Sequence, residues 1–253
     1  MIITCDWHIH SCVSPCAALE MSPSAIVEAL QAKKIQFAAL TDHNTTKNCP
    51  AFATLCKRAN IAALYGMELQ TSEEIHVLCL FSDLQIAMNF GNEIDKLIPF
   101  FQNKPEKNGD QVFVDIHDTI IGEIQKYLQV SASISLEEAA KKVHNLGGLC
   151  IPAHVNRQSF SMISQLGCII PGEWDALEVI NIPPTYVLPN DPTNHIPLDT
   201  LDFPLTTSSD AHYIDDIAKR PFTLEIKYDS LFHANGTVNL NTIRRSLALR
   251  PRK

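Results

Sequence analysis

Short runs of apolar residues alternate with longer amphipathic stretches along most of the chain. Each run is bounded by polar or turn-forming residues, which is typical of buried strands. The runs predict strands at residues 2–3, 37–40, 61–65, 75–81, 149–151 and 176–180. Because strands that alternate with helices build parallel sheets, the pattern favours an α/β fold.

The stretches between these strands carry helix signals. Ser22 and Pro23 form an N-cap and first helical position ahead of an apolar face. A second helix follows Ser82, with apolar residues at helical spacing at Ala87, Phe90, Ile94, Leu97 and Phe101. A capping box and a double glycine bound a third helix within residues 135–148. Residues 239–253 predict a short terminal helix that ends in the basic sequence RPRK.

Residues 103–133 interrupt the alternation of strands and helices. Their first part, NKPEKNGD, is polar and turn-prone, and residues 111–126 have the pattern of a hairpin around His117 and Asp118. We therefore expect one domain over residues 1–253, with an insertion or cap at about residues 103–133.

Composition narrows the class of protein. The chain is 45% apolar and 19% charged, values typical of a folded domain. Its start lacks a basic segment followed by a long apolar one, and no run reaches the roughly 18 apolar residues of a membrane span. The eight cysteines form no CxxC pair and are interpreted mostly as small buried residues. We expect a cytoplasmic protein without a membrane partner.

The net charge of −8 bears on the substrate. Proteins that hold nucleic acid mainly by charge carry a basic stripe, so the acidic balance argues against a broad nucleic-acid footprint. Phosphate-bearing substrates remain compatible, because bound cations can reverse the field locally.

Six of the ten histidines lie at the ends of predicted strands or within one: His8, His10, His43, His76, His154 and His212. Glu68 and Asp210 occupy similar places. Because residues beyond the carboxyl ends of parallel strands converge on one face, we expect these side chains to lie together. Each has an ordinary alternative; His76, for example, can be a core histidine with a backbone partner. Together they predict a site for several divalent metal ions.

At these motifs the chain resembles the PHP family, the polymerase and histidinol phosphatase domains. The motifs are HxH at His8 and His10, TDH at 41–43, GME at 66–68, His76 in EIHVL, PAH at 152–154 and SDAH at 209–212. The resemblance covers residues 3–220 and implies a distorted (β/α)7 barrel with two or three ions, typically manganese, iron or zinc. The ligands that it implies are His8, His10, His43, Glu68, His76, His154, Asp210 and His212, with Glu68 bridging two ions.

The first motif departs from the family pattern at Pro15. Many members read HxHxxxSDG, and that aspartate is a further ligand, whereas Pro15 stands in its place here. Glu20 can replace it as a ligand, or it can cap the helix that begins near Ser22. Cys16 can supply a thiolate instead. If neither replaces the aspartate, the third ion is weak or absent.

Further candidates follow from charge. Arg157 and Arg220 lie in predicted loops after His154 and His212, and arginine matches the geometry of phosphate oxygens. We expect Arg157 to be catalytic and both arginines to bind substrate. Asp42 is expected to orient an imidazole or move a proton. His195 is a candidate to protonate a leaving group, as is His117; both lie in loop-like stretches, and the alternative for each is an ordinary solvated histidine.

The sequence therefore predicts a metal-dependent hydrolase that acts on a phosphomonoester, either a nucleotide or another small phosphorylated metabolite, through a metal-bridging hydroxide. The nearest alternative is a phosphodiesterase or 5′→3′ exonuclease on short oligonucleotides. A non-catalytic metal-dependent binding module is an alternative from another class, against which the eight retained ligand-type residues speak. Hydrolysis of a C–N bond is disfavoured, because no lysine lies at a predicted strand end to bridge metals as a carbamate.

Overall fold

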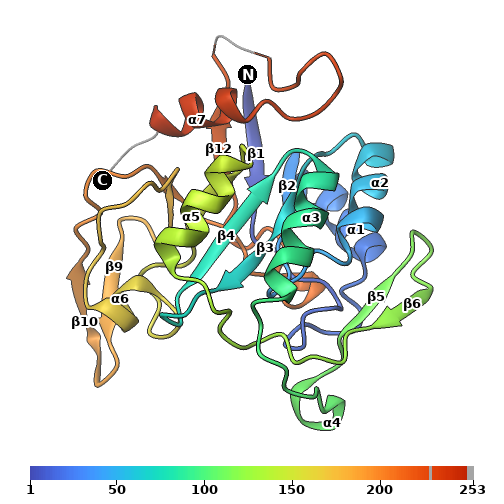
Figure 1. Cartoon of the computed structure of the whole chain (residues 1–253). Coiled ribbons are helices and arrows are strands. Elements are labelled where there is room, and N and C mark those ends of the chain that lie inside the picture. Colours follow the sequence, from blue (N-terminus) through green and yellow to red (C-terminus); the bar gives the residue numbers. More distant parts are fainter. Residues whose placement is uncertain (228–229, 250–253) are drawn as a thin grey trace.

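A mixed sheet lies at the centre of the fold, and helices cover its outer face (Figure 1). The computed structural model describes residues 1–227 and 230–249. Within them the main sheet has the order β12-β1-β2-β3-β4-β7. Its strands are β1 (Ile2–Asp6), β2 (Phe37–Leu40), β3 (Ala62–Gln70), β4 (His76–Phe81), β7 (Leu149–Pro152) and β12 (Phe222–Glu225). The covering helices are α1 (Pro23–Ala32), α2 (Cys49–Ala59), α3 (Leu84–Asp95) and α5 (Leu136–Asn145).

Two short strands curl this sheet towards a barrel. β8 (Leu177–Glu178) pairs in parallel with β11 (Leu205–Thr206). On one side, the amide of Val155, just after β7, donates to the carbonyl of Glu178 at 2.8 Å. On the other side, the amide of Asp210 donates to the carbonyl of His8 at 2.9 Å. Backbone hydrogen bonds thus continue from β7 through β8 and β11 back to the end of β1.

A strict (β/α)7 alternation is not what the structure has. β1, β2 and β3 are parallel, but β4 is antiparallel to both β3 and β7. Residues 71–75 join β3 to β4 directly. A connection between parallel strands needs a dozen or more residues, so this short one makes β4 antiparallel to β3. The amino end of β4, where His76 lies, therefore meets the carboxyl ends of the parallel strands.

The core alternates along each strand between the barrel interior and the helix layer. Trp7, Phe37 and Phe222 pack edge to face inside, with ring centroids 5.1 Å apart for Trp7–Phe37 and 4.8 Å for Trp7–Phe222. Ala38 and Leu40, on the opposite face of β2, pack with the buried faces of α1 and α2. The Ser22 cap predicted for α1 is present, and its hydroxyl accepts from the amide of Ala25 at 3.3 Å.

Two element boundaries differ from the sequence prediction. β3 continues beyond Tyr65 to Gln70, because the following residues pair with β4 and are buried. Glu68 is therefore within a strand and not beyond its end. α3 ends at Asp95, although its apolar spacing continues to Phe101. Pro99 disfavours helix in the residue before it, and Phe101 is exposed.

Smaller elements flank the edge at which β3 and β4 are joined. Residues 103–133 contain α4 (Pro105–Asn108) and the predicted hairpin, formed by β5 (Val112–Val114) and β6 (Ile120–Glu123). A second hairpin, of β9 (Thr185–Leu188) and β10 (Asp191–Pro197), lies on the other side in Figure 1 and was not predicted. The remaining helices are α6 (Met162–Leu166), the 3-10 turn η1 (Ile214–Asp216) and α7 (Leu240–Ala248).

α7 confirms the predicted terminal helix up to Ala248, whereas the basic residues 250–253 lie outside the described part of the chain. No helix in residues 1–227 or 230–249 combines the length and the apolar character that crossing a bilayer requires.

Candidate metal centre

Eight ligand-type side chains that the sequence singled out come together at one edge of the sheet. His8 and His10 follow β1, His43 follows β2, and His154 follows β7. Glu68 lies in β3 beside His43, to which a parallel bridge joins it. His76 begins β4, and Asp210 and His212 follow β11. The antiparallel direction of β4 explains why a residue at the start of a strand belongs to this set.

Glu68 is the centre of the cluster. Its Oε1 lies 2.8 Å from His76 Nδ1 and 2.9 Å from His154 Nε2. Its Oε2 lies 3.0 Å from His43 Nδ1 and 3.3 Å from His10 Nε2. A carboxylate that meets imidazoles through both oxygens has the geometry to bridge two cations.

Asp210, in the segment after β11, completes the cluster on the side of His8 and His10. Its Oδ1 lies 3.3 Å from Nε2 of both His8 and His10, and those two nitrogens are 3.1 Å apart. Asp210 and His154 also have positive φ angles of 53° and 30°, which non-glycine residues rarely adopt. Such backbone strain concentrates at functional sites, where surrounding structure holds it in place.

The donor atoms are spaced as ligands of divalent cations are, and they do not all pair with one another by hydrogen bonds. In three overlapping groups, one donor atom from each member lies within 4.8 Å of the others: His8, His10, Glu68 and Asp210; His43, Glu68 and His76; and His10, Cys16, His43 and His212. His76 Nε2 and His154 Nδ1, both buried, also lack hydrogen-bond partners. An unpaired buried polar atom is costly, so this donor set is suited to binding cations.

Burial controls the charge of the imidazoles. It lowers the pKa of His43 and His212 to about 4 and that of His76 to about 3. These rings are therefore neutral at pH 7, the state in which a histidine nitrogen binds a metal.

The carboxylates of the cluster stay charged. Burial raises the pKa of Glu68 and Asp210, but the histidines around them, led by His76 and His8 respectively, outweigh it and hold both well below the usual range. Burial lowers the pKa of His8, yet Glu178 and Glu68 raise it well above its ordinary value. Two buried carboxylates, Glu68 and Asp210, therefore carry negative charge in the site, which favours the binding of cations.

Glu178 is a member of the site that the sequence reasoning missed. It lies in β8, is 1% exposed, and its Oε2 accepts from His8 Nδ1 at 2.9 Å. When the ring is neutral, that bond keeps the proton on Nδ1 and leaves the lone pair of His8 Nε2 facing the cluster. A charged residue in the middle of the apolar run at 176–180 was the available signal, since glutamate is rarely buried without a partner.

Asp42 organises the loop after β1 and does not enter the cluster. It accepts from the Ser11 amide at 2.6 Å and from the hydroxyls of Ser11 and Ser14, each at 2.7 Å. Ser14 Oγ also lies 3.1 Å from His10 Nδ1. Asp42 therefore acts on the imidazole of His10 through Ser14.

The two candidate arginines face different partners. Arg157 Nη1 donates to Asp210 Oδ2 at 2.8 Å, beside the cluster, and its side chain is 31% exposed. Arg220 donates to the backbone carbonyls of Ser208 and Ser209, each at 3.1 Å. The guanidinium of Arg220 thus holds the chain just ahead of Asp210.

Three further candidates lie apart from the cluster. Glu20 is exposed and belongs to none of the three donor groups, while Ser22 supplies the side-chain cap of α1. His195 is exposed on β10, where its Nδ1 lies 3.4 Å from Thr185 Oγ1. His117 is exposed at the tip of the β5–β6 hairpin.

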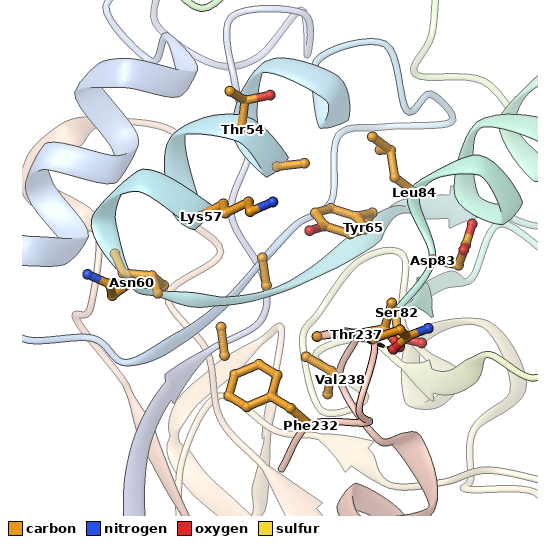
Figure 2. Close-up of a pocket in the computed structure, with 16 residues that line it drawn as sticks. Thr54, Lys57, Asn60, Tyr65, Ser82, Asp83, Leu84, Phe232, Thr237 and Val238 are labelled. Atoms are coloured by element: carbon orange, nitrogen blue, oxygen red, sulfur yellow. Dashed lines mark hydrogen bonds between the residues drawn. The ribbon is translucent and has the colours of Figure 1, made fainter.

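A pocket elsewhere is separate from this chemistry. The pocket has a volume of about 570 Å³. Lys57 from α2, Tyr65 from β3, Phe232 and Val238 are among the residues that line it (Figure 2). It borders the first part of β3, and the lining residue of that strand nearest to Glu68, Tyr65, lies roughly 10 Å from it along the strand. None of the eight ligand-type residues lines it.

The chain is similar to known proteins in sequence family and in fold. The family profile of the PHP domain matches residues 6–161, more than half of the chain. No curated protein matches the sequence.

The similar structures include nucleases and a phosphoesterase. The lesion-specific endonuclease Q of Pyrococcus furiosus has a TM-score of 0.61 at 15% identity, over 98% of this chain. An endonuclease Q complex with a 27-mer duplex carrying an abasic lesion has a TM-score of 0.61 at 16% identity, also over 98%. This chain spans 56% of each of those two chains. A candidate metal-dependent phosphoesterase from Bifidobacterium adolescentis has a TM-score of 0.56 at 19% identity, covering 98% of this chain and 96% of that one.

Proposed function

This chain belongs to the PHP domain family of metal-dependent phosphoesterases, and on that premise we propose that it hydrolyses phosphomonoesters of small metabolites or nucleotides. The observation that carries the proposal is the convergence of six histidines with Glu68 and Asp210, with Arg157 beside them. Imidazole and carboxylate donors suit Mn, Fe or Zn ions. When bound, two or three such ions would supply Lewis acidity and offset the charge of a phosphate.

The residues around the donors hold them in place for that chemistry. Glu178 fixes the ring of His8 through Nδ1, and Ser14, held by Asp42, does the same for His10. Both histidines then present Nε2 to the interior of the cluster. Such outer partners set the tautomer and orientation of metal-binding histidines.

Arg157 is the residue that we assign to phosphate binding. Its guanidinium is fixed by Asp210 through one nitrogen and by the carbonyl of Ser159 through Nε at 3.3 Å. Its partly exposed side chain lies at the edge of the cluster. A guanidinium in this position can bind the non-bridging oxygens of a phosphate and stabilise the charge that develops on them.

Access to the cluster supports a terminal phosphate as the reacting group. The side chains of His8, His10, His43, Glu68, His76 and His154 are at most 4% exposed. Exposure rises to 13% for Asp210, 23% for His212 and 31% for Arg157. A substrate would therefore approach from the side of these three residues. A phosphate at the end of a molecule reaches a recessed centre more easily than one inside a duplex.

A phosphodiesterase acting on nucleic acid is the second candidate. The fold similarity to endonuclease Q, one structure of which holds a DNA duplex with an abasic lesion, favours it. The net charge of −8 does not, because nucleic-acid binding draws its affinity largely from basic side chains.

The test compares substrate classes on the full chain loaded with Mn²⁺, Fe²⁺ or Zn²⁺. We expect turnover of p-nitrophenyl phosphate and of nucleoside monophosphates, and little turnover of bis-p-nitrophenyl phosphate or a 5′-labelled oligonucleotide. His8→Ala and Asp210→Ala should abolish turnover with an unchanged circular dichroism spectrum. Preference for the diester would favour the second candidate, and near-wild-type turnover in either variant would refute a role for the cluster.

Arg157→Ala tests the phosphate-binding residue. Loss of a group that binds substrate and transition state should lower kcat/KM by about 100-fold, corresponding to about 3 kcal/mol. The exposed Arg58 on α2 supplies the matched control, Arg58→Ala, which should leave kcat/KM unchanged. Equal kinetics for the two variants would exclude Arg157 from the site.

A further inference from the structure

Cys16 lies among three histidines of the centre. A donor atom of Cys16 and one each of His10, His43 and His212 lie within 4.8 Å of one another. No other cysteine of residues 1–227 and 230–249 belongs to such a group. Cys16 directly follows Pro15, the position at which the first motif departs from the family pattern.

The backbone on both sides of Cys16 is held by the site itself. Before it, Ser14 Oγ accepts from the amide of His43 at 3.1 Å and lies the same distance from His10 Nδ1. After it, the amide of Ala18 donates to the carbonyl of His212 at 3.0 Å. The loop that carries Cys16 is thus fastened to the residues of the same group.

Hydrogen bonds also leave histidine lone pairs free for a ligand in this group. His212 Nδ1 donates to the carbonyl of Asp210 at 2.8 Å, so its Nε2 carries no proton when the ring is neutral. His43 is 3% exposed, and its Nδ1 lies 3.0 Å from Glu68 Oε2, which leaves Nε2 as its other donor nitrogen. His10 Nε2 lies 3.1 Å from His8 Nε2 and belongs with the neighbouring group around Asp210. Cys16 and His212 belong to this group alone, and His43 is shared with the group of Glu68 and His76.

From this geometry we infer that Cys16 is a metal ligand and that, with His43 and His212, it forms a sulfur-containing site beside the His/carboxylate groups. The thiol loses its proton to solvent as the sulfur–metal bond forms. A thiolate is a softer donor than the carboxylate that it replaces, so this site favours Zn²⁺, Co²⁺ or Fe²⁺ over Mn²⁺. The inference rests on one part of the proposed function, namely that the centre binds metal ions.

Other cysteines provide the comparison. Cys12, in the same loop, contacts Asn48 and the carbonyl of Val112 and so faces the insertion. Cys168 is exposed and belongs to none of the three donor groups. Cys168→Ser therefore removes a thiol without touching the proposed site, and it is the matched control for Cys16→Ser.

The experiment uses the full chain, stripped of metal by a chelator and titrated with Co²⁺. The wild type and Cys168→Ser should both gain a near-ultraviolet thiolate-to-cobalt charge-transfer band. Cys16→Ser should lose that band and bind one Zn²⁺ fewer per chain by elemental analysis. Cys16→Asp should recover the ion without the band and raise Mn²⁺ affinity over that of Cys16→Ser at least 10-fold.

Three outcomes decide the inference. A band of wild-type intensity in Cys16→Ser, or no band in a Co²⁺-saturated wild type, would overturn it. Equal Zn²⁺ counts in the wild type and Cys16→Ser, with matching apo-protein spectra, would overturn it as well. Turnover of p-nitrophenyl phosphate is measured separately: a Cys16-dependent band without turnover refutes the proposed function alone, and turnover without the band refutes the ligand alone.

Discussion

At the scale of single residues, the centre depends on side chains that do not themselves point into it. Glu178 accepts from His8, and Ser14 connects Asp42 to His10. A ring held in this way loses little rotational freedom when it binds a cation, and its tautomer is already set. The affinity of the site therefore depends on residues that a list of ligands would omit.

Glu178→Gln tests this dependence. The amide keeps the size of the carboxylate but removes the charge that orients and polarises His8, so metal affinity should fall about 10- to 100-fold. Competition with a metallochromic chelator measures it. Glu137→Gln on α5, where the side chain is 76% exposed, is the control and should bind metal as the wild type does. Identical affinities for both variants would contradict the role of Glu178.

At the scale of elements, short polar contacts tie residues 103–133 to the edge of the sheet. Asn44 Nδ2 donates to the carbonyls of Leu128 and Val130, and its Oδ1 accepts from the amide of Gln70 at 2.9 Å. Asn44 directly follows His43, so the segment is anchored beside a candidate ligand.

Asn44→Ala should therefore destabilise the fold and loosen this segment. Three backbone hydrogen bonds to the Asn44 side chain are lost, and the buried amide of Gln70 is left without its side-chain acceptor, a kind of loss that costs about 1–3 kcal/mol. Asn60→Ala is a matched control, because Asn60 has a φ of 55° against 53° for Asn44 but is exposed at the end of α2. Urea unfolding should show a loss several-fold larger for Asn44→Ala, and equal losses would show that only backbone strain matters.

At the scale of the whole molecule, the centre joins strands from both ends of the sequence. His8 and Asp210 are adjacent across the seam where the end of β1 meets the segment after β11. Cations bound there connect elements that otherwise meet through few backbone bonds. Their binding free energy therefore adds to the stability of the fold.

Removing metal should lower the melting temperature. A ligand at 100 times its Kd adds about 2.7 kcal/mol, which corresponds to about 5–10 °C for a domain of this size. Differential scanning calorimetry with chelator, and then with restored Mn²⁺ or Zn²⁺, measures the difference. Asp210→Ala should show a smaller response, and a wild-type melting temperature indifferent to chelator would contradict the prediction.

The sequence by itself determined the α/β character, the helix caps and the motif residues that gather at one edge. These follow from local causes: apolar periodicity, capping hydroxyls, and the rule that residues after parallel strands share a face. The donors that the fold brings together, from His8 to His212, were each visible as a polar residue at or within an apolar run.

Only the tertiary structure decided the rest. β4 runs antiparallel, so His76 reaches the edge from the start of its strand, and Glu68 lies inside β3 because pairing with β4 extends that strand. A glutamate within an apolar run marked Glu178 as unusual, but only the fold gives its partner, His8. The path of the loop brings Cys16, and not Glu20, into a donor group. These features depend on which segments meet across long sequence distances, and local propensity carries no information about that.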